Sequence, residues 1–292
     1  MAYVLSGGGS LGAVQVGMLQ AMTEMGIRPD LLIGTSVGAL NAAYIAGHGV
    51  EPDALDNLKR LWTGLHRHDV FPFDPARLAE AALGRAPSIF TNSGLRKLIE
   101  HHLPFDRLED AKIPLHVVTT DVASGSEVDL SSGKASRAIL ASTAIPAIYP
   151  SVRIDGKDLM DGGVADNSSV SLAVKLGADA IYVLPTGYTC ALDEPPSNPL
   201  ASAMHALTLL IEQRLILEVA TLGDQVDMKV IPPLCPLSVS STDFRHSKEL
   251  IKRARQESEK WLNGPGITHD HPEQFLSLHT HHRHGVQSPK SR

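Results

Sequence analysis

Cysteine is scarce in this sequence: Cys190 and Cys235 are the only two among 292 residues. Two cysteines cannot by themselves build a disulfide framework or complete a zinc site. Such scarcity is typical of proteins in a reducing compartment. From cysteine usage we therefore expect a cytoplasmic protein.

Long apolar runs are also missing, since no run approaches the roughly 20 residues that cross a bilayer. Residues 1–5 lack the basic region that opens a secretory signal peptide. We expect neither a signal peptide nor a transmembrane segment, and any membrane contact should be peripheral.

The sequence has no excess of positive charge, because its formal net charge is -6. A protein that binds nucleic acid needs a concentrated Lys/Arg surface to neutralise phosphates. The densest basic run, residues 252–255, is interleaved with Glu249, Glu257 and Glu259, a pattern typical of a solvated helix face. We therefore expect no nucleic-acid partner.

Histidine, by contrast, is abundant, with fourteen residues. Six of them lie in residues 263–292, and none forms an HExxH pair on a predicted helix. We predict no metal site. The polar tail 263–292 is expected to be disordered, which leaves residues 1–262 as one domain.

Short apolar runs alternate with helical patterns, which predicts an α/β fold. Strands are predicted at residues 3–6, 31–33, 115–120, 127–130, 152–154, 180–184 and 229–231, with a further short run that ends at Met160. Helices are predicted at residues 14–25, 39–46, 54–65, 76–83, 93–102, 136–142, 168–176, 200–222 and 243–262.

Residues 69–75 are predicted to form a turn that exposes Phe71 and Phe73. Two interpretations of this turn stay open. It shapes the mouth of a binding pocket, or it is a loop that fills the core.

Residues 34–38 (GTSVG) match the G-x-S-x-G pattern of a nucleophile elbow. They lie between the predicted strand 31–33 and the predicted helix 39–46, which is the context that an elbow requires. A sharp strand-to-helix turn strains its central residue, and flanking glycines avoid side-chain clashes. The hydroxyl would stand at a helix N-terminus, where a developing anion is favoured. Ser36 is the candidate nucleophile, and a simple tight turn is the alternative.

Residues 7–12 (GGGSLG) also lie between a predicted strand and a helix. They fit two functions: a dinucleotide-binding G-x-G-x-x-G loop, or a set of backbone N–H donors for an oxyanion hole. The dinucleotide loop needs an acidic residue at the end of the next strand. That strand ends instead in the elbow, and Asp30 precedes it. The pattern favours the oxyanion hole.

A base for the serine is the remaining requirement. The sequence DGG at residues 161–163 is typical of a turn. A conventional triad would place a histidine after its aspartate, but His205 and His246 both fall in predicted helices without loop signals.

The three motifs in this order resemble the patatin-like phospholipase family. Residues 141–146 (ASTAIP) also look like the family's A-S-x-x-x-P segment, a structural wall near the site. The resemblance covers residues 3–185. It implies a three-layer α/β/α fold around a mostly parallel sheet, with the elbow after an early strand.

Carried over, the resemblance makes Ser36 the nucleophile and Asp161 the base of a Ser–Asp dyad that cleaves lipid esters through an acyl-enzyme, without cofactor or metal. It places the oxyanion hole at Gly7, Gly8, Gly9 and Leu11. The other motif residues are Gly12, Gly34, Thr35, Val37, Gly38, Gly162 and Gly163.

One position departs from the family pattern, G-G-G-x-R-G. Leu11 stands where many members carry a cation, which weakens the expectation of an anionic head group. With a lipid substrate, the turn at residues 69–75 would shape a mouth that meets lipid aggregates. A conventional Ser-His-Asp hydrolase and a nucleotide-binding protein are the alternatives to a patatin-like lipid hydrolase.

Overall fold

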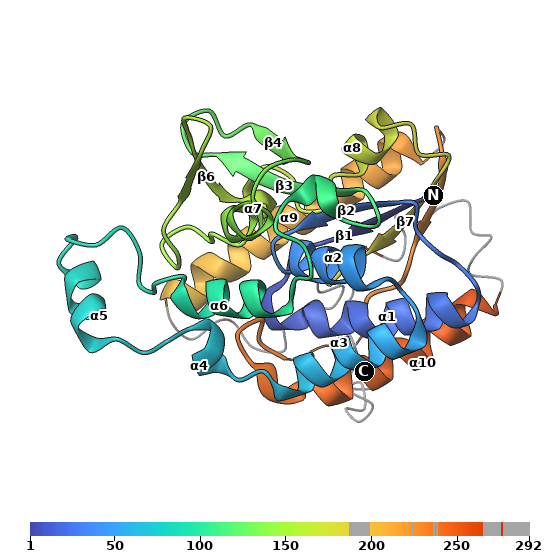
Figure 1. Ribbon diagram of the computed structural model, residues 1–292, viewed down its shortest axis with the longest axis horizontal. Helices are drawn as coiled ribbons and strands as arrows, with labels where there is room; N and C mark the ends of the chain where they lie inside the picture. The colour runs from blue at the N-terminus through green and yellow to red at the C-terminus, as the bar shows by residue number, and fades with distance from the viewer. Residues whose placement is uncertain (187–198, 224, 236, 238, 265–275, 277–292) are drawn as a thin grey trace, which may run out of the picture.

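An eight-stranded sheet forms the centre of the protein (Figure 1). The structure, a computed structural model, describes residues 1–186, 199–223, 225–235, 237, 239–264 and 276. The strands are β1 (Ala2–Leu5), β2 (Leu31–Thr35), β3 (Leu115–Asp121), β4 (Glu127–Leu130), β5 (Val152–Ile154), β6 (Lys157–Asp161), β7 (Ala180–Leu184) and β8 (Asp227–Val230).

The strand order is β5-β6-β3-β2-β1-β7-β8, and β4 pairs with β3 as well. The five strands from β3 to β8 in this order pair in parallel. β4, β5 and β6 extend the sheet with antiparallel pairings. This mostly parallel sheet confirms the predicted α/β fold class.

Helices cover both faces of the sheet. They are α1 (Gly12–Glu24), α2 (Val37–His48), α3 (Pro52–Gly64), α4 (Arg67–Val70), α5 (Pro75–Ala82), α6 (Ser93–His102), α7 (Ala135–Ser142), α8 (Val170–Lys175), α9 (Pro199–Leu222) and α10 (Ser247–Leu262). Short 3-10 turns are η1 (Gly9–Leu11), η2 (Leu108–Asp110), η3 (Gly162–Val164) and η4 (Phe244–His246).

The alternation of side chains along β1 shows the three layers. Tyr3 and Leu5 belong to a core shared with α1, α2, α3, α6, α7 and α10. Ala2 and Val4 face the other way, into a second core shared with α8 and α9. Successive side chains of a strand point to opposite faces, so each face of the sheet has its own helical layer.

The turn predicted at residues 69–75 differs from the structure in two respects. Its start belongs to α4, which has a capping box in which Asp69 Oδ2 accepts a hydrogen bond from His66 N at 2.8 Å. Phe71 is buried, whereas Phe73 is 76% exposed. Only one of the two aromatic side chains is therefore exposed.

The helix predicted at residues 243–262 begins later in the structure, because a 3-10 turn follows Asp243. The Asp243 side chain accepts a hydrogen bond from Arg245 N and so caps η4. The α-helix α10 begins only at Ser247.

Within the described residues, no helix is long and apolar enough to span a bilayer. Of the tail 263–292, the structure describes Asn263, Gly264 and Leu276, and Leu276 is buried in the second core. The other residues expected to be disordered lie outside the described part. Cys235 is disulfide-bonded.

Candidate active site

Strands β2 and β6 meet end to end along one edge of β3. β2 runs parallel to β3 and ends with Thr35 opposite Val118. β6 runs antiparallel and ends with Asp161 opposite Thr119, one position further along. β4 pairs with β3 across both of these positions and so occupies its other edge. The carboxyl ends of β2 and β6 therefore converge, which brings Ser36 and Asp161 together.

Ser36 has the strained backbone of an elbow. Its φ is 52° and its ψ is -123°, a region that non-glycine residues rarely adopt. The chain is tightly packed around it: a Cβ at Gly38 would lie 2.0 Å from Leu5 O, and one at Gly34 would lie 2.6 Å from Ala39 Cα. Glycines at these two positions let α2 begin directly against the sheet, with Ser36 as its N-cap.

The side chains of Ser36 and Asp161 are in contact. Ser36 Oγ donates a hydrogen bond to Asp161 Oδ2 at 2.7 Å. The other carboxyl oxygen, Oδ1, accepts from Gly163 N at 2.9 Å, so the DGG sequence caps the η3 turn and fixes the carboxyl group. Burial raises the pKa of Asp161 to about 6, against the opposing effect of these two hydrogen bonds. The carboxyl group is thus ionised at neutral pH and is a stronger base than an exposed aspartate.

Two residues that the sequence did not single out as functional hold the pair in place. Ser142 Oγ accepts a hydrogen bond from Ser36 N at 2.8 Å and donates to Val118 O at 2.6 Å. Thr120 Oγ1 donates to the carbonyl oxygen of Asp161 at 2.8 Å. The motif at residues 141–146 includes Ser142, but it indicated only a structural wall near the site. No motif indicated Thr120.

The glycine loop lies beside Ser36, and Gly9 and Ser36 line the same pocket. Gly9 has a φ of +60°, and a Cβ there would lie 2.3 Å from Ser241 O. The Gly7 N–H donates to Asn167 Oδ1 at 2.9 Å, and the Leu11 N–H donates to Gly8 O at 3.2 Å. The N–H groups of Gly8 and Gly9 have no acceptor within the part of the chain that is described.

Asn167 and Thr186 fix the loop from two sides. Asn167 contacts Gly7 as above, and the Thr186 hydroxyl donates to Gly7 O. Both residues follow the elements that flank the site, η3 and β7 respectively. No sequence motif identified them, because their role depends on pairings between distant segments.

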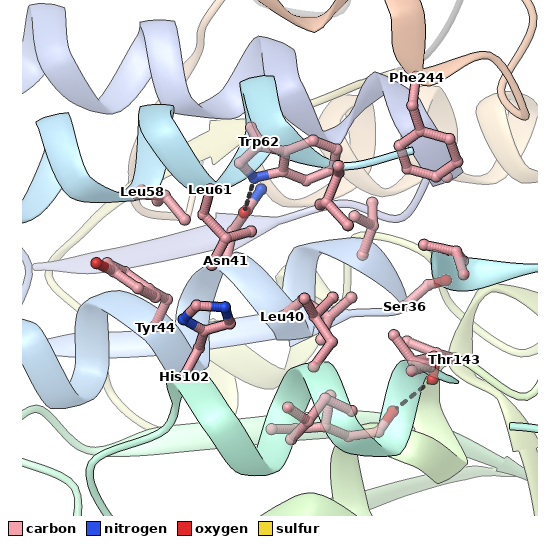
Figure 2. A pocket seen from close by; sticks show the side chains of 18 of the residues that line it. Ser36, Leu40, Asn41, Tyr44, Leu58, Leu61, Trp62, His102, Thr143 and Phe244 are labelled. Carbon is pink, nitrogen blue, oxygen red and sulfur yellow. Dashed lines mark hydrogen bonds between the residues drawn. The ribbon is translucent and has the colours of Figure 1, made fainter. Parts of the chain in front are cut away.

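An apolar pocket extends from Ser36 between α2, α3 and α6 (Figure 2). Leu40, Leu58, Leu61 and Trp62 line it, together with Phe71 and Tyr149, whose rings stack with centroids 5.7 Å apart. Two polar side chains of the wall bond to each other: Trp62 Nε1 donates to Asn41 Oδ1 at 2.9 Å. A hydrocarbon chain attached to a group at Ser36 fits such a lining.

No histidine among the described residues hydrogen-bonds to Ser36 or Asp161. His246 is close to Asp243 and Glu249 at the surface. His205 lies in α9, and its side chain is outside the description. The described residues also contain no group of three or more His, Cys, Asp or Glu side chains that could hold a metal ion.

Comparison with known proteins assigns the chain to a family. The model of the family "Patatin-like phospholipase" matches residues 3–174, more than half of the chain. The chain belongs to the patatin-like phospholipase family. This match includes the elbow, the glycine loop and Asp161.

Curated relatives of this family match at low identity. Rat "Patatin-like phospholipase domain-containing protein 7" is 28% identical over 192 residues, which are 64% of this chain and 14% of that protein. "Lysophospholipase nte1" of Neurospora crassa is 27% identical over 253 residues, 78% of this chain and 16% of that protein. The chain therefore spans only a small part of the length of these relatives.

A solved structure gives a more distant likeness. The crystal structure of VipD from Legionella pneumophila aligns at 17% identity and a TM-score of 0.46, covering 94% of this chain and 66% of that chain. The assignment to the patatin-like family rests on the family match.

Proposed function

We propose that this protein hydrolyses carboxylic esters of lipids through an acyl-enzyme on Ser36, with Asp161 as the base. The observation that carries the proposal is the 2.7 Å hydrogen bond from Ser36 Oγ to a buried carboxylate, at the end of an apolar pocket. Membership in the patatin-like phospholipase family supports a lipid acyl substrate.

In the proposed reaction, Ser36 Oγ attacks the ester carbonyl carbon while Asp161 Oδ2 takes the hydroxyl proton. The carbonyl π electrons move to oxygen, and the N–H groups of Gly8 and Gly9 would stabilise this oxyanion. Collapse expels the alcohol, which takes the proton from Asp161. A water molecule then attacks the acyl-enzyme and gives its proton to Asp161, and release of the acid returns a proton to Ser36 Oγ.

Gly7 and Leu11 stay predictions as oxyanion donors. Their N–H groups already have acceptors in Asn167 and Gly8, so either residue would have to exchange a hydrogen bond to take part. Gly8 and Gly9 are the better candidates because they need no such exchange. Each donor of this kind typically contributes about 3 kcal/mol to the transition state.

Contact with a lipid surface is the second part of the proposal. Helix α5 projects from one end of the molecule (Figure 1), and none of its residues is buried. With its flanks it exposes Phe73, Leu78 and Leu83. α4, which precedes it, contributes Val70 to the pocket that contains Ser36. The segment 73–87, named here the arm, thus joins an exposed apolar surface to the substrate pocket.

Ser36→Ala and Asp161→Asn test the dyad. Each variant should lower hydrolysis of a p-nitrophenyl ester by at least about a thousandfold, because each removes a group that bonds or transfers a proton in the reaction. A fluorophosphonate probe should label the wild-type protein and not Ser36→Ala. Asp158→Asn, on the same strand but exposed, is the matched control. Near wild-type activity in Asp161→Asn would rule out the dyad.

A further inference from the structure

The depth of the pocket can be estimated from the positions of its lining residues along helix α2. Ser36 is the N-cap of α2, and Leu40 and Tyr44 follow at intervals of four residues, on one face of the helix. At a rise of 1.5 Å per residue, Tyr44 lies roughly 12 Å from Ser36 along the helix axis. Figure 2 shows Ser36 toward one end of the pocket and Tyr44 toward the other.

A histidine stands at that far end. His102 is the last residue of α6, and its ring lies between Leu40 and Tyr44 in Figure 2. The lining between Ser36 and this ring is almost entirely apolar, with leucines from α2, α3 and α6. His102 therefore marks the place where an apolar pocket becomes polar.

The surroundings of the His102 ring come from two neighbouring histidines. The backbone oxygen of His102 contacts His48 Nε2 at 3.0 Å, and the His101 ring packs edge-on against the His102 ring at 4.8 Å. Within the described part of the chain, neither ring nitrogen of His102 has a hydrogen-bond partner. The residue is only half-buried, so water can solvate these nitrogens while the pocket is empty.

We propose that His102 limits the length of the acyl chain that the pocket accepts, favouring chains that end before its ring. A longer chain would cover the ring nitrogens with hydrocarbon and remove their water without offering a partner, which is unfavourable. The loss of one such hydrogen bond corresponds to about a tenfold loss of kcat/KM. This inference rests on the proposed function.

The test measures kcat/KM for p-nitrophenyl butyrate, octanoate, dodecanoate and palmitate. In the wild-type protein the value should rise to octanoate and fall about tenfold at palmitate, whose chain is longer than the span from Ser36 to His102. His102→Leu, with an apolar side chain, should bring palmitate to at least the octanoate value. His102→Met serves the same purpose if the leucine variant is unstable.

Two variants separate polarity from other effects. His102→Gln keeps a polar group in the pocket and should still disfavour palmitate. His101→Leu changes an exposed neighbour that does not line the pocket, and it should keep the wild-type profile.

The inference is overturned if His102→Leu keeps the wild-type ratio of palmitate to octanoate, or if His102→Gln relaxes that ratio equally. A wild-type protein that hydrolyses every ester no faster than Ser36→Ala would overturn the proposed function as well. The two failures are therefore distinguishable.

Discussion

At the scale of single residues, the ionisation of Asp161 should make the activity of the protein depend on pH. The Asp161 side chain accepts hydrogen bonds from Ser36 and Gly163, and burial raises its pKa to about 6. A general base works only when it is ionised, so kcat/KM should fall as the pH is lowered through about 6, approaching tenfold per pH unit below it. The measurement is a pH–rate profile on an uncharged soluble ester. A profile that stays level from about pH 7 to about pH 4 would contradict the role of Asp161.

The same residue should lower the stability of the fold at neutral pH. The folded protein holds the Asp161 proton up to about pH 6, whereas an aspartate with the ordinary pKa of 3.8 loses it earlier. The group therefore destabilises the folded state progressively as the pH rises from about 4 to about 6, by about 3 kcal/mol in full. Asp161→Asn removes this charge, and urea unfolding near pH 8 should show a variant more stable by about 1–3 kcal/mol.

The gain should disappear near pH 4, where the buried carboxyl group is already protonated. Asp158→Asn removes an exposed carboxylate from the same strand and one surface ion pair with Arg153. It should change stability by less than about 0.5 kcal/mol at either pH. Equal effects of the two substitutions would show that Asp161 carries no unfavourable buried charge.

At the scale of elements, the start of α2 depends on a close approach to β1. A Cβ at Gly38 would lie 2.0 Å from the backbone oxygen of Leu5, which cannot move without disturbing the sheet. Gly38→Ala should therefore destabilise the protein by about 1–3 kcal/mol and displace Ser36. Gly64→Ala is the control, because a Cβ there meets nothing within 4 Å and alanine favours a helix by up to about 1 kcal/mol. Denaturant unfolding and ester hydrolysis together measure both effects.

The elements were predictable where local pattern decides them. Apolar runs and helical periodicity predicted the central strands and α1, α2 and α6 to within a few residues. Helix α4 was missed because its capping box uses His66 and Asp69 in place of the usual Ser/Thr with Glu. The predicted helix 243–262 started too early because Asp243 caps the 3-10 turn η4, and the same residue type can precede a 3-10 turn or an α-helix.

At the scale of the whole molecule, the contact between Ser36 and Asp161 depends on pairings that no local pattern encodes. The two residues are 125 positions apart and meet because β6 returns antiparallel to β3 beyond the end of β2. The motifs predicted this contact only through their resemblance to the patatin-like family. Asn167, which contacts Gly7 from 160 positions away, belonged to no motif and could not be predicted.

The arm extends this reasoning to the outer surface of the molecule. Two acidic and two basic side chains balance in the arm, residues 73–87, whereas the whole chain has a net charge of -6. The arm is therefore a segment that can approach an anionic bilayer without the repulsion that the whole chain would meet. Phe73, 76% exposed, would then be buried in the lipid, whereas Phe71 packs inside the protein.

Phe73→Ser should lower binding to phosphatidylglycerol-containing vesicles by roughly tenfold or more, because it removes a side chain whose burial is worth about 1.5–3 kcal/mol. Hydrolysis of a soluble butyrate ester should stay unchanged. Leu217→Ser, which alters a side chain 66% exposed on α9, should affect neither measurement. Vesicle sedimentation measures binding. Equal binding by Phe73→Ser and the wild-type protein would show that Phe73 makes no lipid contact. The arm would then be interpreted as a purely structural segment.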